Sequence, residues 1–188
     1  SGGVEVATGS DALQDRLYKN DGGLAFTSDT EALPKSRLGS GPCCAADFDG
    51  DGDLDLFVGG RAIPGAFPEA PPSRLLRNDG GRFVDVTAEV APMLQTAGMV
   101  TAAMFVGISG DTFPDLMIAA QWQPVRYLRN TDGKQFTDVT AEAGLAAATG
   151  LWNSIAALDA DGDGDTDFVV GNLGRNTKYK ASPDHPLG

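Results

Sequence analysis

The fold of this chain depends on one stretch, Asp47-Phe48-Asp49-Gly50-Asp51-Gly52-Asp53-Leu54-Asp55. Its five carboxylates alternate with glycine or apolar residues, and the apolar run Leu56-Phe57-Val58 follows. Because carboxylates at this density repel one another at neutral pH, a folded chain holds them together around a cation. The stretch therefore predicts a metal-binding loop that leads into a β-strand.

This first Asp loop (residues 47–55) has a counterpart near the end of the chain. The last Asp loop (residues 159–167) reads Asp159-Ala160-Asp161-Gly162-Asp163-Gly164-Asp165-Thr166-Asp167, and Phe168-Val169-Val170 follows it. Two copies with the same apolar continuation are not an accident of composition, so we take the loop as part of a repeat.

A weaker copy, the middle loop (residues 107–115), lies between the other two. It keeps Asp111 and Asp115 but has Gly107 and Ser109 at the first two acidic positions, and Leu116-Met117-Ile118 follows. The final aspartates of the three loops lie 60 and 52 residues apart. We expect the middle loop to keep the turn and to bind metal weakly or not at all.

A second repeated pattern is offset from the loops by about half a period. The chain reads Arg-Leu-Tyr-Lys-Asn-Asp-Gly-Gly at 16–23, Arg-Leu-Leu-Arg-Asn-Asp-Gly-Gly at 74–81 and Arg-Tyr-Leu-Arg-Asn-Thr-Asp-Gly at 126–133. Asn-Asp-Gly between apolar runs is typical of a tight β-hairpin turn. One unit thus reads strand, Asp loop, strand, connection, strand, turn, strand, which predicts an all-β fold of β-propeller-type four-stranded antiparallel blades. The best helix candidate is a turn or two from Ala88 to Leu94.

The chain reads as a single repeat region, residues 1–188, of about three blade equivalents. Its units cover residues 10–38 (partial), 39–97, 98–149 and 150–180 (partial). Because closed propellers have at least about four blades, three arrangements stay open. These are an open arc, a fragment of a larger propeller, and a ring completed by association with further copies.

The spacing D-x-D-x-D-G-x-x-D lets carboxylates at positions one, three, five and nine converge on one ion, with a backbone carbonyl at position seven. Six or seven hard oxygen ligands in a flexible loop favour Ca²⁺ over Mg²⁺. An EF-hand needs a Glu at position twelve, where Val58 and Val170 stand, so that alternative fails. Two calcium sites are predicted, with Asp47, Asp49, Asp51, Asp53 and Asp55 in the first and Asp159, Asp161, Asp163, Asp165 and Asp167 in the last.

On these loops and hairpins the sequence resembles the FG-GAP/VCBS repeat family, the repeats of integrin-α-like β-propellers. The resemblance runs from Arg16 to Gly171, and Gly171 to Tyr179 is similar to stretches of large bacterial members in which further blades follow. It implies a Ca²⁺-stiffened module that is secreted or on the cell surface, extracellular or periplasmic. It also implies a structural, adhesion or assembly scaffold. Such a scaffold would bind a protein or glycan partner or associate with further copies of itself.

An alternative function is a catalytic or non-catalytic part of a secreted carbohydrate-active enzyme. We expect no enzyme, because no catalytic constellation is visible and most carboxylates belong to the Asp loops. The formal net charge of −12 argues against nucleic acid as a partner. Neither a signal peptide nor an apolar run long enough to span a membrane is recognisable. Adjacent Cys43 and Cys44 are expected to be small buried side chains, a strained vicinal disulfide being the alternative.

Overall fold

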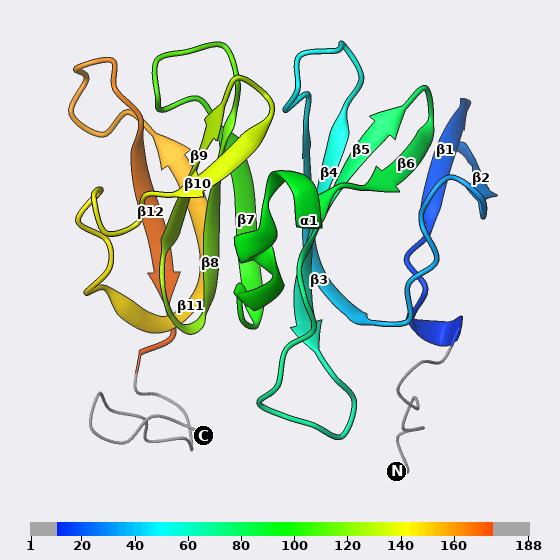
Figure 1. Ribbon diagram of the computed structural model, residues 1–188, viewed down its shortest axis with the longest axis horizontal. Coiled ribbons are helices and arrows are strands. Elements are labelled where there is room, and N and C mark those ends of the chain that lie inside the picture. The colour runs from blue at the N-terminus through cyan, green and yellow to red at the C-terminus, as the bar shows by residue number, and fades with distance from the viewer. Residues whose placement is uncertain (1–10, 175–188) are drawn as a thin grey trace.

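The computed structural model describes residues 11–174, and these form a nearly all-β protein, which confirms the predicted fold class. Two complete four-stranded antiparallel blades lie side by side (Figure 1). Blade 2 is formed by β3 (Gly39–Ala46), β4 (Asp55–Ala62), β5 (Arg74–Asp79) and β6 (Arg82–Asp85). Blade 3 is formed by β7 (Val100–Val106), β8 (Asp115–Pro124), β9 (Arg126–Thr131) and β10 (Gln135–Asp138).

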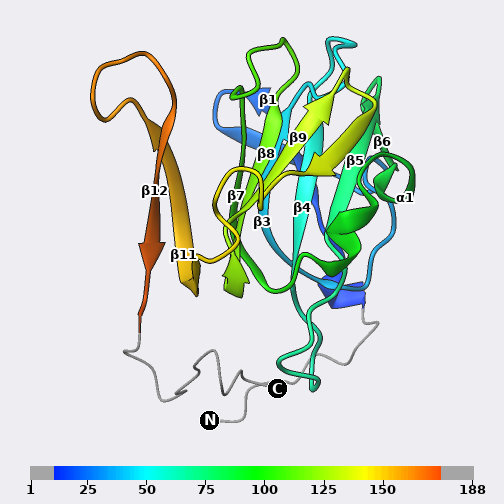
Figure 2. The same ribbon diagram turned by 60° about the vertical axis from the view of Figure 1, so that its left-hand side comes forward.

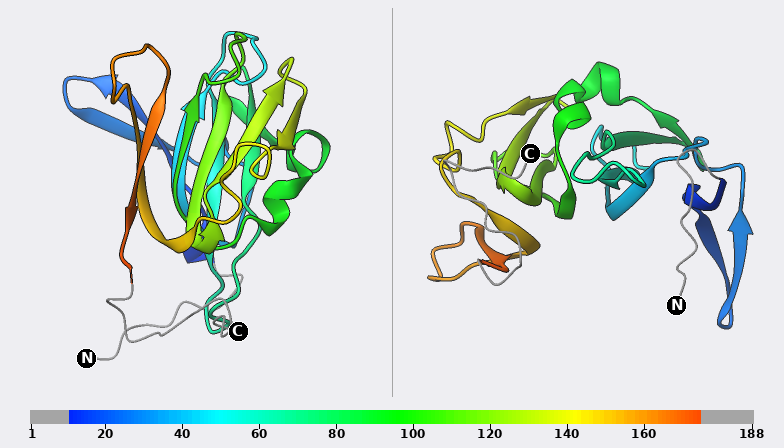
Figure 3. Two further views of the ribbon diagram at one scale, coloured as in Figure 1. Left: turned by 90° about the vertical axis from the view of Figure 1, so that its left-hand side faces the viewer. Right: turned by 90° about the horizontal axis from the view of Figure 1, so that it is seen from below.

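Two half-blades flank the complete ones. Half-blade 1 is the hairpin of β1 (Leu17–Gly22) and β2 (Ala25–Asp29), after the short 3₁₀ helix η1 (Asp11–Leu13). Half-blade 4 pairs β11 (Thr149–Leu158) with β12 (Asp167–Asn172), and β11 also pairs with the end of β8. The right-hand view of Figure 3 shows the four parts in an open arc, with the β1–β2 hairpin and β12 at opposite ends, and Figure 2 shows β11 and β12 to one side of the complete blades. The predicted partial units and the Gly171 to Tyr179 segment reach beyond residues 11–174 and lie in part outside the described residues.

The main core lies between blades 2 and 3, because the strand faces that meet there are apolar. Phe57 and Leu75 of blade 2 and Leu116 and Phe136 of blade 3 are at most 1 % exposed. A Cβ at Gly59 on β4 would lie 2.9 Å from the Cβ of Val100 on β7, so only glycine lets these strands approach so closely. Among the described residues, the half-blades contribute none to this buried cluster, and they expose apolar side chains such as Phe26 and Val169.

A short helical segment covers the outer side of this core. It consists of α1 (Thr87–Val90) and the 3₁₀ helix η2 (Pro92–Thr96), which confirms the helix expected from Ala88 to Leu94. Leu94 is fully buried in the core. Within residues 11–174, the helices are too short and polar to cross a lipid bilayer.

The expectation that both cysteines are buried is wrong for Cys43. It is exposed, whereas Cys44 is partly buried and packs against the core. Adjacent residues on a strand point to opposite faces, and both cysteines lie on β3. The same alternation separates their sulfur atoms, and both thiols are free. Burial raises the pKa of the Cys44 thiol to about 12, so it stays protonated at neutral pH.

Candidate metal centre

The first Asp loop, between β3 and β4, brings three of its five carboxylates together. One oxygen each from Asp47, Asp49 and Asp51 lies within 4.8 Å of the others. Asp47 fixes the turn, since its carboxylate accepts the N–H groups of Gly50 at 2.7 Å and Gly52 at 2.9 Å. The glycines take positive φ angles of 79° and 97°, which side chains disfavour. The tight turn therefore aims three carboxylates at one point.

The last Asp loop, between β11 and β12, repeats this geometry 112 residues later. Asp159 accepts the N–H groups of Gly162 at 2.7 Å and Gly164 at 3.1 Å, as Asp47 does in the first loop. Here one oxygen each from Asp159, Asp161 and Asp167 lies within 4.8 Å of the others. Two loops far apart in sequence thus build the same backbone turn around a cluster of carboxylates.

The remaining predicted ligands lie in the same turns but outside these two groups. Asp55 and Asp163 do not belong to the clusters of their loops. Asp53 and Asp165 were predicted to contribute backbone carbonyls, and the Asp53 side chain accepts the N–H of Gly80 at 3.1 Å. Metal coordination by the ten aspartates stays a prediction.

Asp55 anchors the first loop to its own blade. It is fully buried, and its two oxygens accept the N–H groups of Phe48 at 2.9 Å and Asn78 at 2.8 Å. Burial first, and then the charges of Asp49 and Asp51, raise the pKa of Asp55 to about 6, although the two hydrogen bonds lower it. Burial and the Asp51 charge also raise the pKa of Asp49. A cation would offset this cost, so the loop fits one.

The middle loop keeps the turn, as predicted. Buried Asp115 accepts the N–H groups of Ser109 at 2.9 Å and Asn130 at 2.8 Å, and the hydroxyl of Tyr127 at 3.0 Å. Asp111 accepts the N–H of Phe113 at 2.9 Å. These bonds explain an Asp at each of the two positions without a metal.

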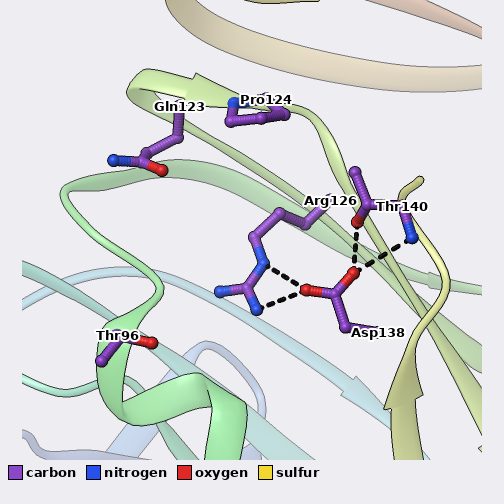
Figure 4. A pocket seen from close by; sticks show the side chains of 6 residues that line it. All are labelled: Thr96, Gln123, Pro124, Arg126, Asp138 and Thr140. Atoms are coloured by element: carbon purple, nitrogen blue, oxygen red, sulfur yellow. Dashed lines mark hydrogen bonds and ion pairs between the residues drawn. The ribbon is translucent and has the colours of Figure 1, made fainter. Parts of the chain in front are cut away.

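The sequence did not reveal which acidic residue pairs with the arginine that opens the third strand of each blade. In blade 3, Arg126 donates to Asp138 at 2.6 Å and 3.1 Å, and Asp138 accepts the Thr140 N–H at 3.0 Å, beside a pocket of about 280 Å³ (Figure 4). In blade 2, Asp85 likewise accepts the N–H and the hydroxyl of Thr87. Arg74, however, pairs with Asp15, which lies ahead of β1. The repeated Asp-Val-Thr at 85–87 and 138–140 is the sequence pattern that indicates this hydrogen bonding between Asp and Thr.

Comparison with known proteins agrees with this architecture. A family model for the FG-GAP-like repeat matches residues 2–58 and 108–170, which is more than half of the chain and includes the whole of the first and last Asp loops and all but Gly107 of the middle loop. No curated protein matches the chain significantly. With its repeated blades and Asp loops, the chain belongs to the FG-GAP-like repeat family.

Proposed function

We propose that the chain is a calcium-binding extracellular β-propeller repeat module that acts as a structural, adhesion or assembly scaffold. The observation that carries the proposal is the pair of carboxylate clusters built on identical turns. Carboxylate oxygens in a loop that can supply further carbonyl or water ligands suit Ca²⁺, which takes six to eight oxygens in flexible geometry. Extracellular modules bind Ca²⁺ at about 10⁻⁴ to 10⁻³ M, matched to secretion or display on the cell surface.

The proposal treats the module as non-catalytic. In the pocket of Figure 4 the carboxylate is Asp138, and Arg126 and Thr140 both hold it. Burial raises the pKa of Asp138, but these contacts together lower it below its usual value, which favours a permanent charge over proton transfer. The arrangement supports a structural ion pair rather than the acid/base pair that a glycosidase needs.

Direct calcium binding tests the proposal. We expect equilibrium dialysis of the metal-free chain to give two bound Ca²⁺ ions, one for each cluster. The double variants Asp47→Asn/Asp49→Asn and Asp159→Asn/Asp161→Asn should each retain one ion, because each removes two carboxylates from one cluster only. The proposal fails if the unmodified chain binds no calcium, or if either double variant still binds as much as the unmodified chain.

The half-blades support a role in assembly. In blades 2 and 3, the Asp that opens the second strand accepts the N–H of the turn Asn on the third strand at 2.8 Å (Asp55 from Asn78, and Asp115 from Asn130). Asp167 on β12 and Asn20 on β1 hold the equivalent acceptor and donor positions, but in different half-blades. Apolar side chains near both edges are more than half exposed, including Val169, Tyr18 and Phe26. A β1–β2 hairpin therefore has the pattern that would complete the β11–β12 half-blade.

Sedimentation of the chain with and without Ca²⁺ measures this assembly. We expect self-association at micromolar concentration through the β12 edge, strengthened by Ca²⁺ because the last Asp loop leads into β12. Val169→Lys should weaken it by placing a charge at the new contact. Val84→Lys on β6 is the matched control, since Val84 is also exposed but lies on the outer strand of a complete blade. A monomer at every concentration, or equal effects of both variants, would rule out assembly through this edge.

A further inference from the structure

The first Asp loop is in contact with blade 3 as well as with its own blade. The backbone carbonyl of Phe48, which lies between Asp47 and Asp49, accepts a hydrogen bond from the Asn130 side-chain amide at 2.8 Å. Asn130 lies 82 residues further along the chain, at the end of β9. Both residues are only 1 % exposed, so water does not compete for this bond. The loop backbone is therefore tied to the neighbouring blade between two carboxylates of the metal cluster.

The β9–β10 turn also lies directly against the loop. A Cβ added to Gly133 would stand 2.7 Å from the Asp49 Cα and 2.9 Å from the Asp49 carbonyl oxygen. Gly133 has a φ of 67°, and Gly80, at the β5–β6 turn of blade 2, has a similar φ of 64°. A Cβ on Gly80, by contrast, would meet nothing within 4 Å. The close approach at Gly133 is thus a contact between blades and not a general demand of the turn.

The middle loop contributes a third contact from blade 3. A Cβ on Gly50 of the first loop would lie 3.1 Å from the Phe113 ring. Phe113 holds the position that Asp53 and Asp165 hold in the other two loops. The middle loop therefore packs against its neighbour at a position where the other loops carry a carboxylate.

An aromatic pair fixes the other side of the loop. The rings of Phe48 and Phe136 pack with centroids 5.9 Å apart and planes at 60°, and both are buried in the shared core. In the last loop the equivalent of Phe48 is Ala160, which is exposed. The two Asp loops thus build the same turn, but the described contacts with a following blade belong to the first.

We propose that Asn130 and Gly133 of blade 3 position the first Asp loop for its cation, so that cation binding at this loop and docking of blade 3 stabilise each other. The inference rests on the proposed calcium function and adds that the first site depends on blade 3, whereas the last site does not. Coupling between two such events is reciprocal, and a typical coupling changes affinity by at least about five-fold. Asn130 and Gly133 are positioning residues here, since their contacts are with the loop backbone.

The test measures Ca²⁺ affinity at one loop at a time. The first loop is isolated in a background with Asp159→Asn/Asp161→Asn, and the last loop in a background with Asp47→Asn/Asp49→Asn. We expect Asn130→Ala to weaken Ca²⁺ binding at the first loop by about five-fold or more and to leave the last loop unchanged. Gly133→Ala should weaken the first loop more than Gly80→Ala does, because the two share the backbone cost and only the Cβ at Gly133 would clash with Asp49. Alanine at position 80 keeps the N–H that the Asp53 side chain accepts.

Each outcome separates the inference from the proposed function. If neither background binds Ca²⁺ before Asn130 is changed, the calcium function itself fails. If both loops bind but Asn130→Ala leaves the first loop as it was, the positioning role is wrong and the calcium function stands. Equal weakening of both loops, or equal effects of Gly133→Ala and Gly80→Ala, would show a general loss of structure and would also overturn the positioning role. Circular dichroism of each variant shows whether the β-structure persists.

Discussion

Removal of Ca²⁺ with excess EDTA is expected to lower the melting temperature of the chain by roughly 10 to 20 °C. A ligand that binds only the folded state at 100 times its dissociation constant adds about 2.7 kcal/mol of stability per site. For a domain of 150–250 residues, each kcal/mol moves the melting temperature by about 2–4 °C. The expected shift adds the stability contributed by one Ca²⁺ ion at each of the two carboxylate clusters. Thermal unfolding followed by circular dichroism, with Ca²⁺ and with EDTA, gives the shift directly.

The negative charge of the two Asp loops is the physical reason why removal of Ca²⁺ should lower the melting temperature. Without a cation, the carboxylates of each cluster repel one another at neutral pH, and burial adds to the cost at Asp49. Restored Ca²⁺ should therefore restore the original melting temperature. Na⁺ at the same ionic strength is the control, since screening alone reduces repulsion without supplying a bound ion. An unchanged melting temperature in EDTA, or full rescue by Na⁺, would contradict a calcium contribution to stability.

The repeated parts of the fold could be predicted from the sequence because their causes are local. An Asp loop followed by an apolar run defines its own turn and the start of its strand, as Asp115 and β8 show even where three of the five carboxylates are lost. The Asn-Asp-Gly signal at residues 78–80 likewise placed the β5–β6 hairpin. Short-range hydrogen bonds and alternation along the strand are enough for these predictions.

Contacts between blades were not predictable in this way. Asn130 reads as one more turn residue in the sequence, yet its amide reaches Phe48 in another blade. Cys43 reads as a small core residue, yet β3 turns it to the exposed side. Arg74 and Arg126 hold the same repeat position, but one pairs with Asp15 and the other with Asp138. The contacts of Asn130 and Arg74 depend on which neighbouring blade is present, and a local pattern does not carry that information.

Substitution of the final Asp of each loop should give three different losses of stability. Asp115→Ala is expected to cost about 4 kcal/mol or more, because it leaves four donors without this acceptor, among them the buried Asn130 N–H and the partly buried Tyr127 hydroxyl. Asp55→Ala removes the acceptor of only two N–H groups, the buried one of Phe48 and the partly buried one of Asn78, and should cost less than Asp115→Ala. Asp167 is less buried and accepts the Ala160 N–H, so Asp167→Ala should cost about 1 kcal/mol. Urea unfolding in EDTA measures all three without a metal contribution.

Repeating the series in Ca²⁺ separates the anchoring role of each Asp from metal binding. The cost of Asp167→Ala should rise, because Asp167 shares a cluster with Asp159 and Asp161 and its loss weakens the site. The oxygens of Asp115 are occupied by protein donors, so the cost of Asp115→Ala should depend on Ca²⁺ only through Asn130, whose N–H Asp115 accepts and whose side chain contacts the first loop. Asp55 is the informative case, because it anchors its blade but lies outside the first cluster: a calcium-dependent cost would make it a ligand, as the sequence predicts. Equal costs for Asp115→Ala and Asp167→Ala in EDTA would contradict the anchoring role of the buried bonds.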